Sequence, residues 1–283
     1  MANTIEKAKT YIQDEQALQR LFRNYAFTQD LAKEFKGKGN GTVSIKSVGL
    51  SSTTAGDYSK ENGLTAIDLN VQFVDKVLSH DKGNTFRIDR LDDEAALSDN
   101  IVIGFNRYGR QVMNPTMDAD NLKAIATFTG IAGKQDTAAT QTTIQDQIDD
   151  GLDTLFKNGL SVNASLVMYI STSCARLLKK SLKASGGYKF GEWNNVVDSS
   201  VALYGDTLKA KVVEIPDSLM PAKVQFLLVP IDAVDFVVAN RSTKLFTEIP
   251  GHGDRKLQLD VNYVYDCFVK DDAKELIYKS YTE

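Results

Sequence analysis

The sequence predicts an α+β fold in which a mixed α/β unit is inserted into a unit of long strands and a long helix. Residues 42–90 contain two or three stretches in which apolar and polar side chains alternate, which is typical of strands with one buried face. From residue 141 onward, helical and strand patterns alternate, which indicates helices packed on a small sheet. The last part of the chain returns to long strands. Because strands both precede and follow the α/β region, we expect the two ends of the chain to share one unit.

The composition is that of a globular protein. Of the 283 residues, 42% are hydrophobic and 25% are charged, which is enough apolar sequence for a sizeable core. The net charge of −4 does not resemble the basic domains that grip nucleic acid. No apolar run approaches the roughly 18 residues of a membrane span, and the polar N-terminus lacks the pattern of a secretion signal. Cys174 and Cys267 are far apart and are expected to be two buried thiols.

The first third of the chain predicts a helix, a hinge and a group of strands. Residues 3–36 have apolar side chains at helical spacing and contain neither glycine nor proline. The glycines of residues 37–41 indicate a hinge, because no strand precedes them as in phosphate-binding loops. A polar loop at 50–64 has a length that is uncommon in a compact domain and is often an interaction element. Strands are expected at 42–49, 66–74 and 84–94.

Helices dominate the centre of the sequence. Residues 91–113 have a helical pattern that Pro115 is expected to end. A second helix is expected at 117–128, with Asp118 and Asp120 in its first turn. Residues 130–140 are small and polar and are expected to form a loop. The remaining expected elements are helices at 143–157 and 172–184, a short segment at 232–239, and strands at 166–171, 210–216, 224–230, 243–249, 257–269 and 275–281.

The sequence contains no arrangement of residues that identifies an enzyme or a metal site. It has no P-loop, no nucleophile elbow and no zinc-ligand spacing. Ser79, His80 and Asp81 contain the letters of a catalytic triad, but a triad is formed by geometry between distant residues. Paired carboxylates lie at expected helix ends and turns, where acidic side chains are common without an active site. We therefore expect a protein that functions through contact with other subunits.

The order of these elements resembles the major capsid proteins of tailed bacteriophages, which have the Hong Kong 97-like fold. In residues 49–97, a tip with glycine, aspartate and tyrosine is followed by an alternating strand, a polar turn and the sequence FRID before the helix, as in that family. Residues 244–278 resemble the family's closing strands. The resemblance covers most of the chain and implies the following division: an N-terminal arm at 1–41, an extended loop at 42–90, a peripheral domain with a long spine helix at 91–129 and 243–283, and an inserted α/β axial domain at 130–242.

The resemblance implies a structural protein of the virion with no catalysis, no cofactor and no membrane partner. Its subunits would form pentamers and hexamers that close an icosahedral head shell around double-stranded DNA, in the host bacterial cytoplasm. Further partners would be a portal protein and scaffolding or decoration proteins, and any scaffold would be a separate protein or the arm itself. An acidic chain can line a DNA container without condensing onto the genome, because tight binding needs many cationic contacts to phosphate.

Contacts between subunits are expected along the extended loop. An exposed ribbon with a regular apolar face is an aggregation hazard unless something covers it, and another subunit is the expected cover. Charged residues at the ends of the loop would fix its register with a neighbour. The expected contact residues are Gly56, Asp57, Tyr58, Lys60, Glu61, Ile67, Leu69, Val71, Phe73, Arg87 and Arg90.

Two alternatives stay open on the sequence alone. The first is the shell protein of an encapsulin-type bacterial nanocompartment, which has the same fold and holds an enzyme in place of DNA. The second is an enzyme of the same α/β-with-β class with an unrecognised site. The genes encoded nearby separate the shell alternatives, since terminase and portal genes accompany a phage capsid and a cargo enzyme accompanies an encapsulin.

Overall fold

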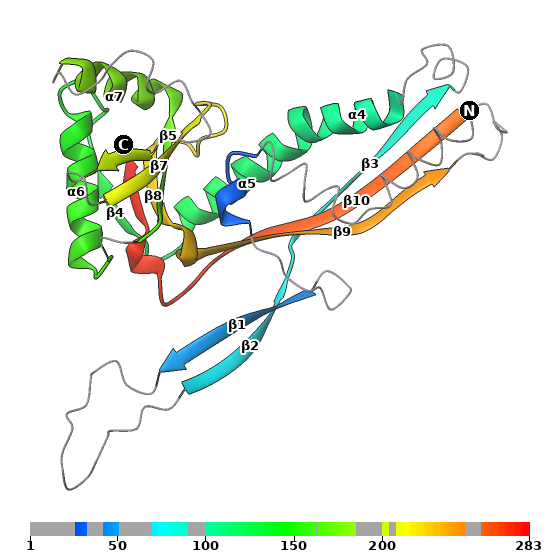
Figure 1. Ribbon diagram of the computed structural model, residues 1–283, viewed down its shortest axis with the longest axis horizontal. Coiled ribbons are helices and arrows are strands. Elements are labelled where there is room, and N and C mark those ends of the chain that lie inside the picture. Colours follow the sequence, from blue (N-terminus) through cyan, green and yellow to red (C-terminus); the bar gives the residue numbers. More distant parts are fainter. Residues whose placement is uncertain are drawn as a thin grey trace, which may run out of the picture.

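The structure, a computed structural model, places two sheets side by side and a narrow ribbon that projects from them (Figure 1). Within the described part of the chain, the sheets have two, three and six strands. Helices and sheets are both extensive, which confirms the expected α+β class. The structure describes residues 26–32, 42–50, 69–89, 100–161, 164–184, 200–203, 208–246 and 256–283.

The three-stranded sheet is long and antiparallel, with the order β3 (His80–Asp89), β10 (Lys256–Val269), β9 (Val234–Phe246). Alternate residues of β10, such as Leu257, Leu259 and Val261, are buried, as expected for a strand with one dry face. The segments expected at 232–239 and 243–249 form the single strand β9. A register shift opposite Asn262 and Tyr263 lets it pair with β10 along its whole length, across the expected domain boundary at residue 242.

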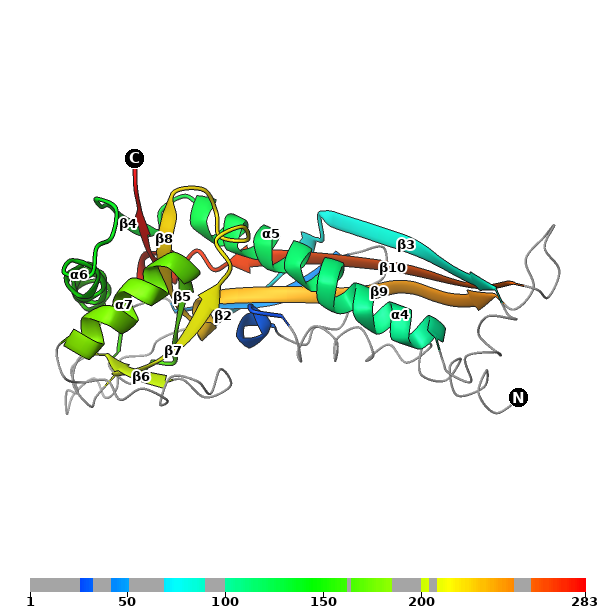
Figure 2. The same cartoon turned by 90° about the horizontal axis from the view of Figure 1, so that it is seen from above.

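A helical rod lies along this sheet (Figure 2). It consists of α4 (Asn100–Tyr108), the π-helical turn η2 (Gly109–Met113) and α5 (Asn114–Thr127). The prediction that Pro115 ends the helix was wrong. In the wide turn η2 the Asn114 N–H donates to the Gly109 carbonyl, five residues back, so Pro115 enters at the start of α5, where its missing N–H costs little.

The six-stranded sheet has the order β4 (Ala132–Gln135), β11 (Tyr278–Tyr281), β8 (Val224–Pro230), β5 (Leu166–Ser171), β7 (Leu208–Ile215), β6 (Ser200–Leu203). The helices α6 (Ile144–Lys157) and α7 (Thr172–Ala184) pack on one face of it through a shared apolar cluster. The helices α6 and α7 and the strands β5 and β8 confirm the sequence predictions. The last strand, β11, lies in this sheet and not beside β10.

The expected loop at 130–140 contains the strand β4, which corrects the sequence prediction. Its four residues pair in parallel with β11, and the Asp136 N–H then donates to the Tyr281 carbonyl at 2.8 Å. Such a short edge strand is held by main-chain hydrogen bonds, so it needs no alternation of apolar side chains.

Residues 26–32 correct the prediction of one helix over 3–36. They form a turn, a short 3-10 helix η1 (Gln29–Leu31) and a bridge from Ala32 to Phe236, while the rest of the expected helix lies outside the described residues. The Asp118 carboxylate accepts hydrogen bonds from the main-chain N–H groups of Phe27 and Thr28. Those two N–H donors are therefore held by a side chain of α5.

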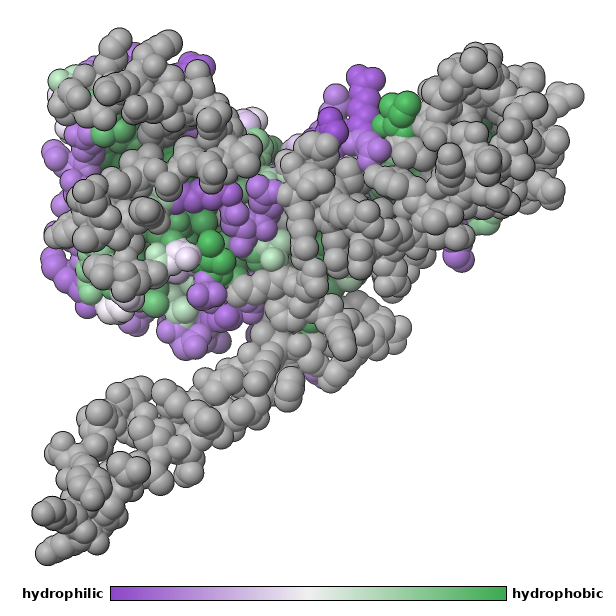
Figure 3. Space-filling model, in the orientation of Figure 1, coloured by the Kyte–Doolittle hydropathy of each residue, from purple (hydrophilic) through white to green (hydrophobic). Residues whose placement is uncertain are grey.

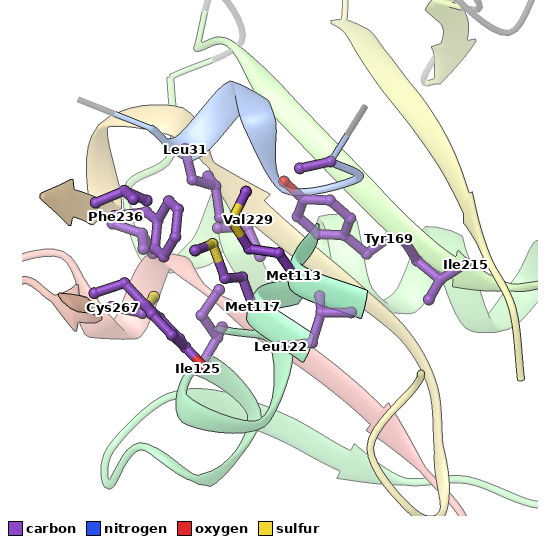
Figure 4. Close-up of a cluster of buried hydrophobic side chains, with 14 of the residues drawn as sticks. Leu31, Met113, Met117, Leu122, Ile125, Tyr169, Ile215, Val229, Phe236 and Cys267 are labelled. Atoms are coloured by element: carbon purple, nitrogen blue, oxygen red, sulfur yellow. The ribbon is translucent and has the colours of Figure 1, made fainter. Parts of the chain in front are cut away.

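The largest apolar cluster lies at the joint between the rod and the two sheets (Figure 4). It contains Leu31 from the N-terminal segment, Met113 and Met117 from the rod, Tyr169 from the six-stranded sheet and Phe236 from the three-stranded sheet. All five side chains are 0% exposed. Both thiols, Cys174 and Cys267, are buried and free, as predicted.

Candidate subunit interface

The strands β1 (Thr42–Leu50) and β2 (Leu69–Val77) form a two-stranded antiparallel ribbon that projects from the body (Figure 1). Their register runs from Thr42 opposite Val77 to Leu50 opposite Leu69. Within the described residues neither strand pairs with a third strand. A two-stranded ribbon on its own is at best marginally stable in water. The ribbon is therefore the part of the fold most in need of an outside partner.

The register gathers apolar positions on one face of the ribbon. Residues directly opposite each other in an antiparallel pair share a face. Leu69 lies opposite Leu50, Val71 lies opposite Val48, and Phe73 lies opposite Lys46. The expected apolar positions of β2 are thus joined by two from β1, which the sequence pattern of either strand alone does not reveal.

The root of the ribbon is fixed to the three-stranded sheet by a small apolar cluster. Val43 of β1 and Leu78, the residue after β2, are 1% and 6% exposed. They pack with Val237 of β9 and Val264 of β10. Because the root is buried, the ribbon leaves the body in a set direction. The sequence analysis missed these two anchors, since Leu78 has the same apolar character as the exposed Val77.

The turn between β2 and β3 is held by polar contacts. The Ser79 N–H donates to Asp266 Oδ2 at 2.9 Å. The His80 ring stacks on Tyr265 with centroids 4.8 Å apart, and its Nδ1 lies 3.8 Å from Asp120 Oδ2. The Tyr265 hydroxyl donates to the same carboxylate oxygen at 2.6 Å. The triad letters at residues 79–81 thus lie where the chain leaves the ribbon and enters β3, and their contacts there orient the ribbon.

The phenol of Tyr265, in β10, stays protonated and donates its hydrogen bond to Asp120 beside this turn. Burial raises its pKa above the usual value, and the hydrogen bond to Asp120 acts in the same direction. Tyr263 stacks on Tyr265 at a centroid distance of 6.1 Å, and its hydroxyl lies 3.3 Å from that of Tyr108 on the rod. The aromatic contacts therefore connect the ribbon root to the helical rod.

The expected contact residues fall into three groups. Leu69, Val71 and Phe73 lie in β2. Arg87 lies exposed on β3, where its Nε donates to Gln258 Oε1 at 2.9 Å. Their contact with another subunit stays a prediction. The others, which lie outside the described residues, are Gly56, Asp57, Tyr58, Lys60, Glu61, Ile67 and Arg90.

The rod adds apolar surface that the sequence analysis did not single out. Ile103 and Val112 are 56% and 48% exposed on the rod. A small hydrophobic group beside hydrophilic residues is visible in the region of α4 (Figure 3). Helical spacing alone could not identify these residues, because apolar positions are spread around the whole rod.

Two kinds of site are missing from the part of the chain that the structure describes. No group of three or more histidine, cysteine, aspartate or glutamate side chains there is placed to hold a metal ion. None of the helices described is long and apolar enough to cross a membrane.

Solved structures with a similar fold include phage capsids and a virus-like particle. The head structure of Helicobacter pylori bacteriophage KHP40 has a TM-score of 0.58 at 11% identity, covering 89% of this chain and 88% of that chain. The mature capsid of bacteriophage PhiM1 has a TM-score of 0.58 at 13% identity, covering 91% and 87%. A virus-like particle from Pyrococcus furiosus has a TM-score of 0.53 at 11% identity, covering 94% and 96%.

No family model and no curated protein sequence matches the chain. The structural similarity extends over nearly the whole chain and includes phage capsids from several sources. The chain therefore has the Hong Kong 97-like fold, and the resemblance expected from the sequence is confirmed at the level of the fold.

Proposed function

We propose that this protein is the major capsid protein of a phage, a structural subunit that assembles with copies of itself into an icosahedral head shell. The observation that carries the proposal is the β1–β2 ribbon. It is fixed at its root, has no third strand within the described residues, and projects from a fold shared with phage capsids. Such a ribbon has the geometry to reach across a neighbouring subunit.

The ribbon would stabilise the shell by burying its apolar face. Burying one Val, Leu or Phe side chain contributes on the order of 1.5–3 kcal/mol. The root cluster of Val43, Leu78, Val237 and Val264 already fixes the ribbon direction, so less orientational freedom is lost when a neighbour docks. Charged residues such as Arg87 would set the register of the contact and add little affinity.

The assembly proposed here has pentamers and hexamers that close around double-stranded DNA. A shell of identical subunits needs heterologous contacts, in which one surface of a subunit meets a different surface of the next. The ribbon and the exposed side of the rod are two such different surfaces. A portal protein, scaffolding or decoration proteins, and assembly in the host cytoplasm complete the proposal.

Deleting residues 52–62, between β1 and β2, tests the function. We expect the purified variant to keep the circular dichroism spectrum of the wild-type subunit, because both sheets lie outside the deletion. Electron microscopy should then show no shells, or shells that break at a lower temperature than wild-type shells. Normal, heat-stable shells from the variant would contradict the role of the loop. A wild-type protein that stays a small, stable monomer under all assembly conditions would contradict the function itself.

The encapsulin-type shell is the second candidate function. The similarity to the virus-like particle from Pyrococcus furiosus, which covers 94% of this chain, favours its inclusion. The two candidates predict different contents for particles purified from the native source. A phage head holds nuclease-protected double-stranded DNA, whereas a nanocompartment holds a second, enzymatic protein.

A further inference from the structure

Residues 26–32 lie where three parts of the molecule meet. Leu31 is 0% exposed in the cluster at the joint between the rod and the two sheets (Figure 4). Ala32 forms a parallel bridge to Phe236 of β9, in the three-stranded sheet. The segment therefore contacts the joint at its centre, beside the crossing from β8 to β9 through the 3-10 helix η3 (Ile231–Ala233).

The first polar anchor of this segment is Asp118 of α5, which is 1% exposed. Its carboxylate accepts three hydrogen bonds: from the Phe27 N–H at 3.0 Å, the Thr28 N–H at 2.9 Å and the Thr28 hydroxyl at 2.7 Å. Asn121, one turn further along α5, donates to Thr28 Oγ1 at 2.9 Å. The rod thus holds Thr28 through both its main chain and its side chain.

The second polar anchor joins the segment to the six-stranded sheet. Lys211 of β7 donates to both carboxylate oxygens of Asp30, at 2.9 and 2.8 Å. These side chains are 29% and 22% exposed, so the pair is screened by solvent less than a surface ion pair. Thr28 is bound to the rod and Asp30 to the sheet, with a single residue between them.

The directionality of these anchors matters for the angle between the two sheets. Apolar contacts such as those of Leu31 are non-directional, so they permit small rotations at the joint. Hydrogen bonds weaken steeply when their angle changes. A short segment with one directional anchor on the rod and another on the six-stranded sheet resists a change in the angle between them.

We propose that residues 26–32 are a brace that fixes the angle between the three-stranded sheet with its rod and the six-stranded sheet. This inference rests on the proposed function in one respect: in a shell, the angle within each subunit sets the curvature, and hence the diameter of the particle. The brace belongs to the arm of the same chain, so a subunit whose arm is displaced would lose its fixed angle.

Two substitutions cut the brace without removing its apolar core. Lys211→Met removes the ion pair with Asp30 and keeps the aliphatic stem, and Thr28→Val removes the hydroxyl with little change of shape. The matched control is Lys179→Met. Lys179 pairs with Glu214, which lies on the same strand β7 as Lys211, with side chains 30% and 32% exposed. Glu214 is three positions from Lys211, so it points to the opposite face of the sheet.

The angle is measured in the unassembled subunit by double electron–electron resonance between spin labels at Thr85 of β3 and Asp153 of α6, both exposed. The two native thiols are buried, so cysteines introduced at these positions take the label selectively. We expect a broader distance distribution in Lys211→Met, broader still with Thr28→Val, and the wild-type distribution in Lys179→Met. Unchanged distributions in both brace variants would overturn the proposal.

The shells give the second readout. Cryo-electron microscopy should show one diameter class for the wild type and for Lys179→Met, and several classes for the brace variants. A single wild-type diameter from the double variant would contradict the link to curvature. If the wild type forms no shells, the proposed function fails, whereas the distance measurement still decides whether the brace exists. If Thr28→Val does not fold, Lys211→Met alone carries the test, because its side chain is partly exposed.

Discussion

Asp118 combines two opposing effects in one residue. Its carboxylate accepts three hydrogen bonds, which lower its pKa, but burial outweighs them, and the net pKa is raised above the usual value. A buried carboxylate of this kind adds little net stability, because desolvation cancels much of the gain from its hydrogen bonds. Its main effect is to fix the position of residues 27 and 28. The N–H groups of Phe27 and Thr28 both donate to this carboxylate, so the segment is held in the one arrangement that satisfies both donors.

Asp118→Asn should destabilise the isolated subunit by about 1–3 kcal/mol, the usual cost of a lost buried hydrogen bond. The NH₂ group of Asn cannot accept a hydrogen bond, so at least one of the three donors that now bind the carboxylate would lose its acceptor. The raised pKa gives the pH dependence. The folded state binds the proton more tightly than the unfolded state, so the contribution of Asp118 is greatest below its unfolded pKa and falls as the pH rises through the folded value.

Urea unfolding of the wild type and Asp118→Asn across the acidic range checks this sign. We expect the difference in free energy of unfolding to be larger at the acid end, near the unfolded pKa, than at neutral pH. A difference that grows toward neutral pH would mean that hydrogen bonding, and not burial, decides the pKa of Asp118.

Residue-level contacts of this kind are the part of the structure that the sequence predicts least. Asp118 was expected in the first turn of a helix, where acidic residues are common, because Pro115 was expected to end the preceding helix and the next one was expected to begin at residue 117. The π-helical turn at 109–113 instead makes the rod continuous and puts Asp118 inside it. Its partners Phe27 and Thr28 are 91 and 90 positions away, a distance over which no local pattern gives information.

At the scale of elements, strong periodicity gave reliable predictions. The helices α6 and α7 and the buried strands β5 and β8 each bury a set of apolar residues with regular spacing, such as Ile144, Ile148, Leu152 and Leu155 of α6. The short strand β4 could not be predicted in this way, because it is held by main-chain pairing with β11. The ribbon strands were predicted, but their shared face depends on a register that the sequence does not show.

Gly151 of α6 packs closely against Tyr278 and Leu228 of the six-stranded sheet, and Gly151→Ala should destabilise the subunit. A Cβ there would lie 2.8 Å from Cε1 of Tyr278 and 3.2 Å from Cδ1 of Leu228. Tyr278 is 1% exposed, so its ring has no free space to move into. We expect a net loss of about 1–2 kcal/mol, since overpacking costs ~1–3 kcal/mol and the better helix propensity of alanine returns up to ~1 kcal/mol.

Gly104→Ala in α4 is the matched control for this substitution. A Cβ at Gly104 has no atom within 4 Å, so only the gain in helix propensity applies. Urea unfolding of isolated subunits should show Gly151→Ala less stable, and Gly104→Ala slightly more stable, than the wild type. If Gly151→Ala is stabilised as much as Gly104→Ala, then α6 does not pack on Tyr278 as closely as described.

At the scale of the whole molecule, the inserted domain expected from the order of the elements stays a prediction, and the strand pairing can be compared with its expected limits. The expected boundary at residue 242 falls inside β9, which pairs with β10 from Val234 to Phe246. The expected peripheral segment 243–283 is shared between the sheets, because β11 pairs with β4 and β8. The partner of a strand depends on packing in the complete sheet. The order of the elements along the chain therefore does not show which sheet a strand joins.

The molecule also has an uneven distribution of stability, which leads to a prediction about assembly. The strands β5 and β8 are central in the six-stranded sheet and almost completely buried, with Val167, Met168, Leu227 and Leu228 at 0% exposure. The ribbon strands β1 and β2 have one hydrogen-bonded neighbour each, so their outer main-chain groups have no strand partner within the described residues. Amides in such a ribbon open locally at low cost in free energy.

Hydrogen–deuterium exchange of the isolated subunit and of the assembled shell measures this difference. We expect the amides of β1 and β2 to exchange quickly in the subunit and at least tenfold more slowly in the shell, because a neighbour covers the ribbon there. The amides of β5 and β8 are the internal control and should exchange slowly in both states, since their protection depends only on the fold of one chain. Rapid exchange of β1 and β2 in intact shells would mean that the ribbon stays uncovered, and that some other surface, such as the exposed side of the rod at Ile103 and Val112, holds the subunits together.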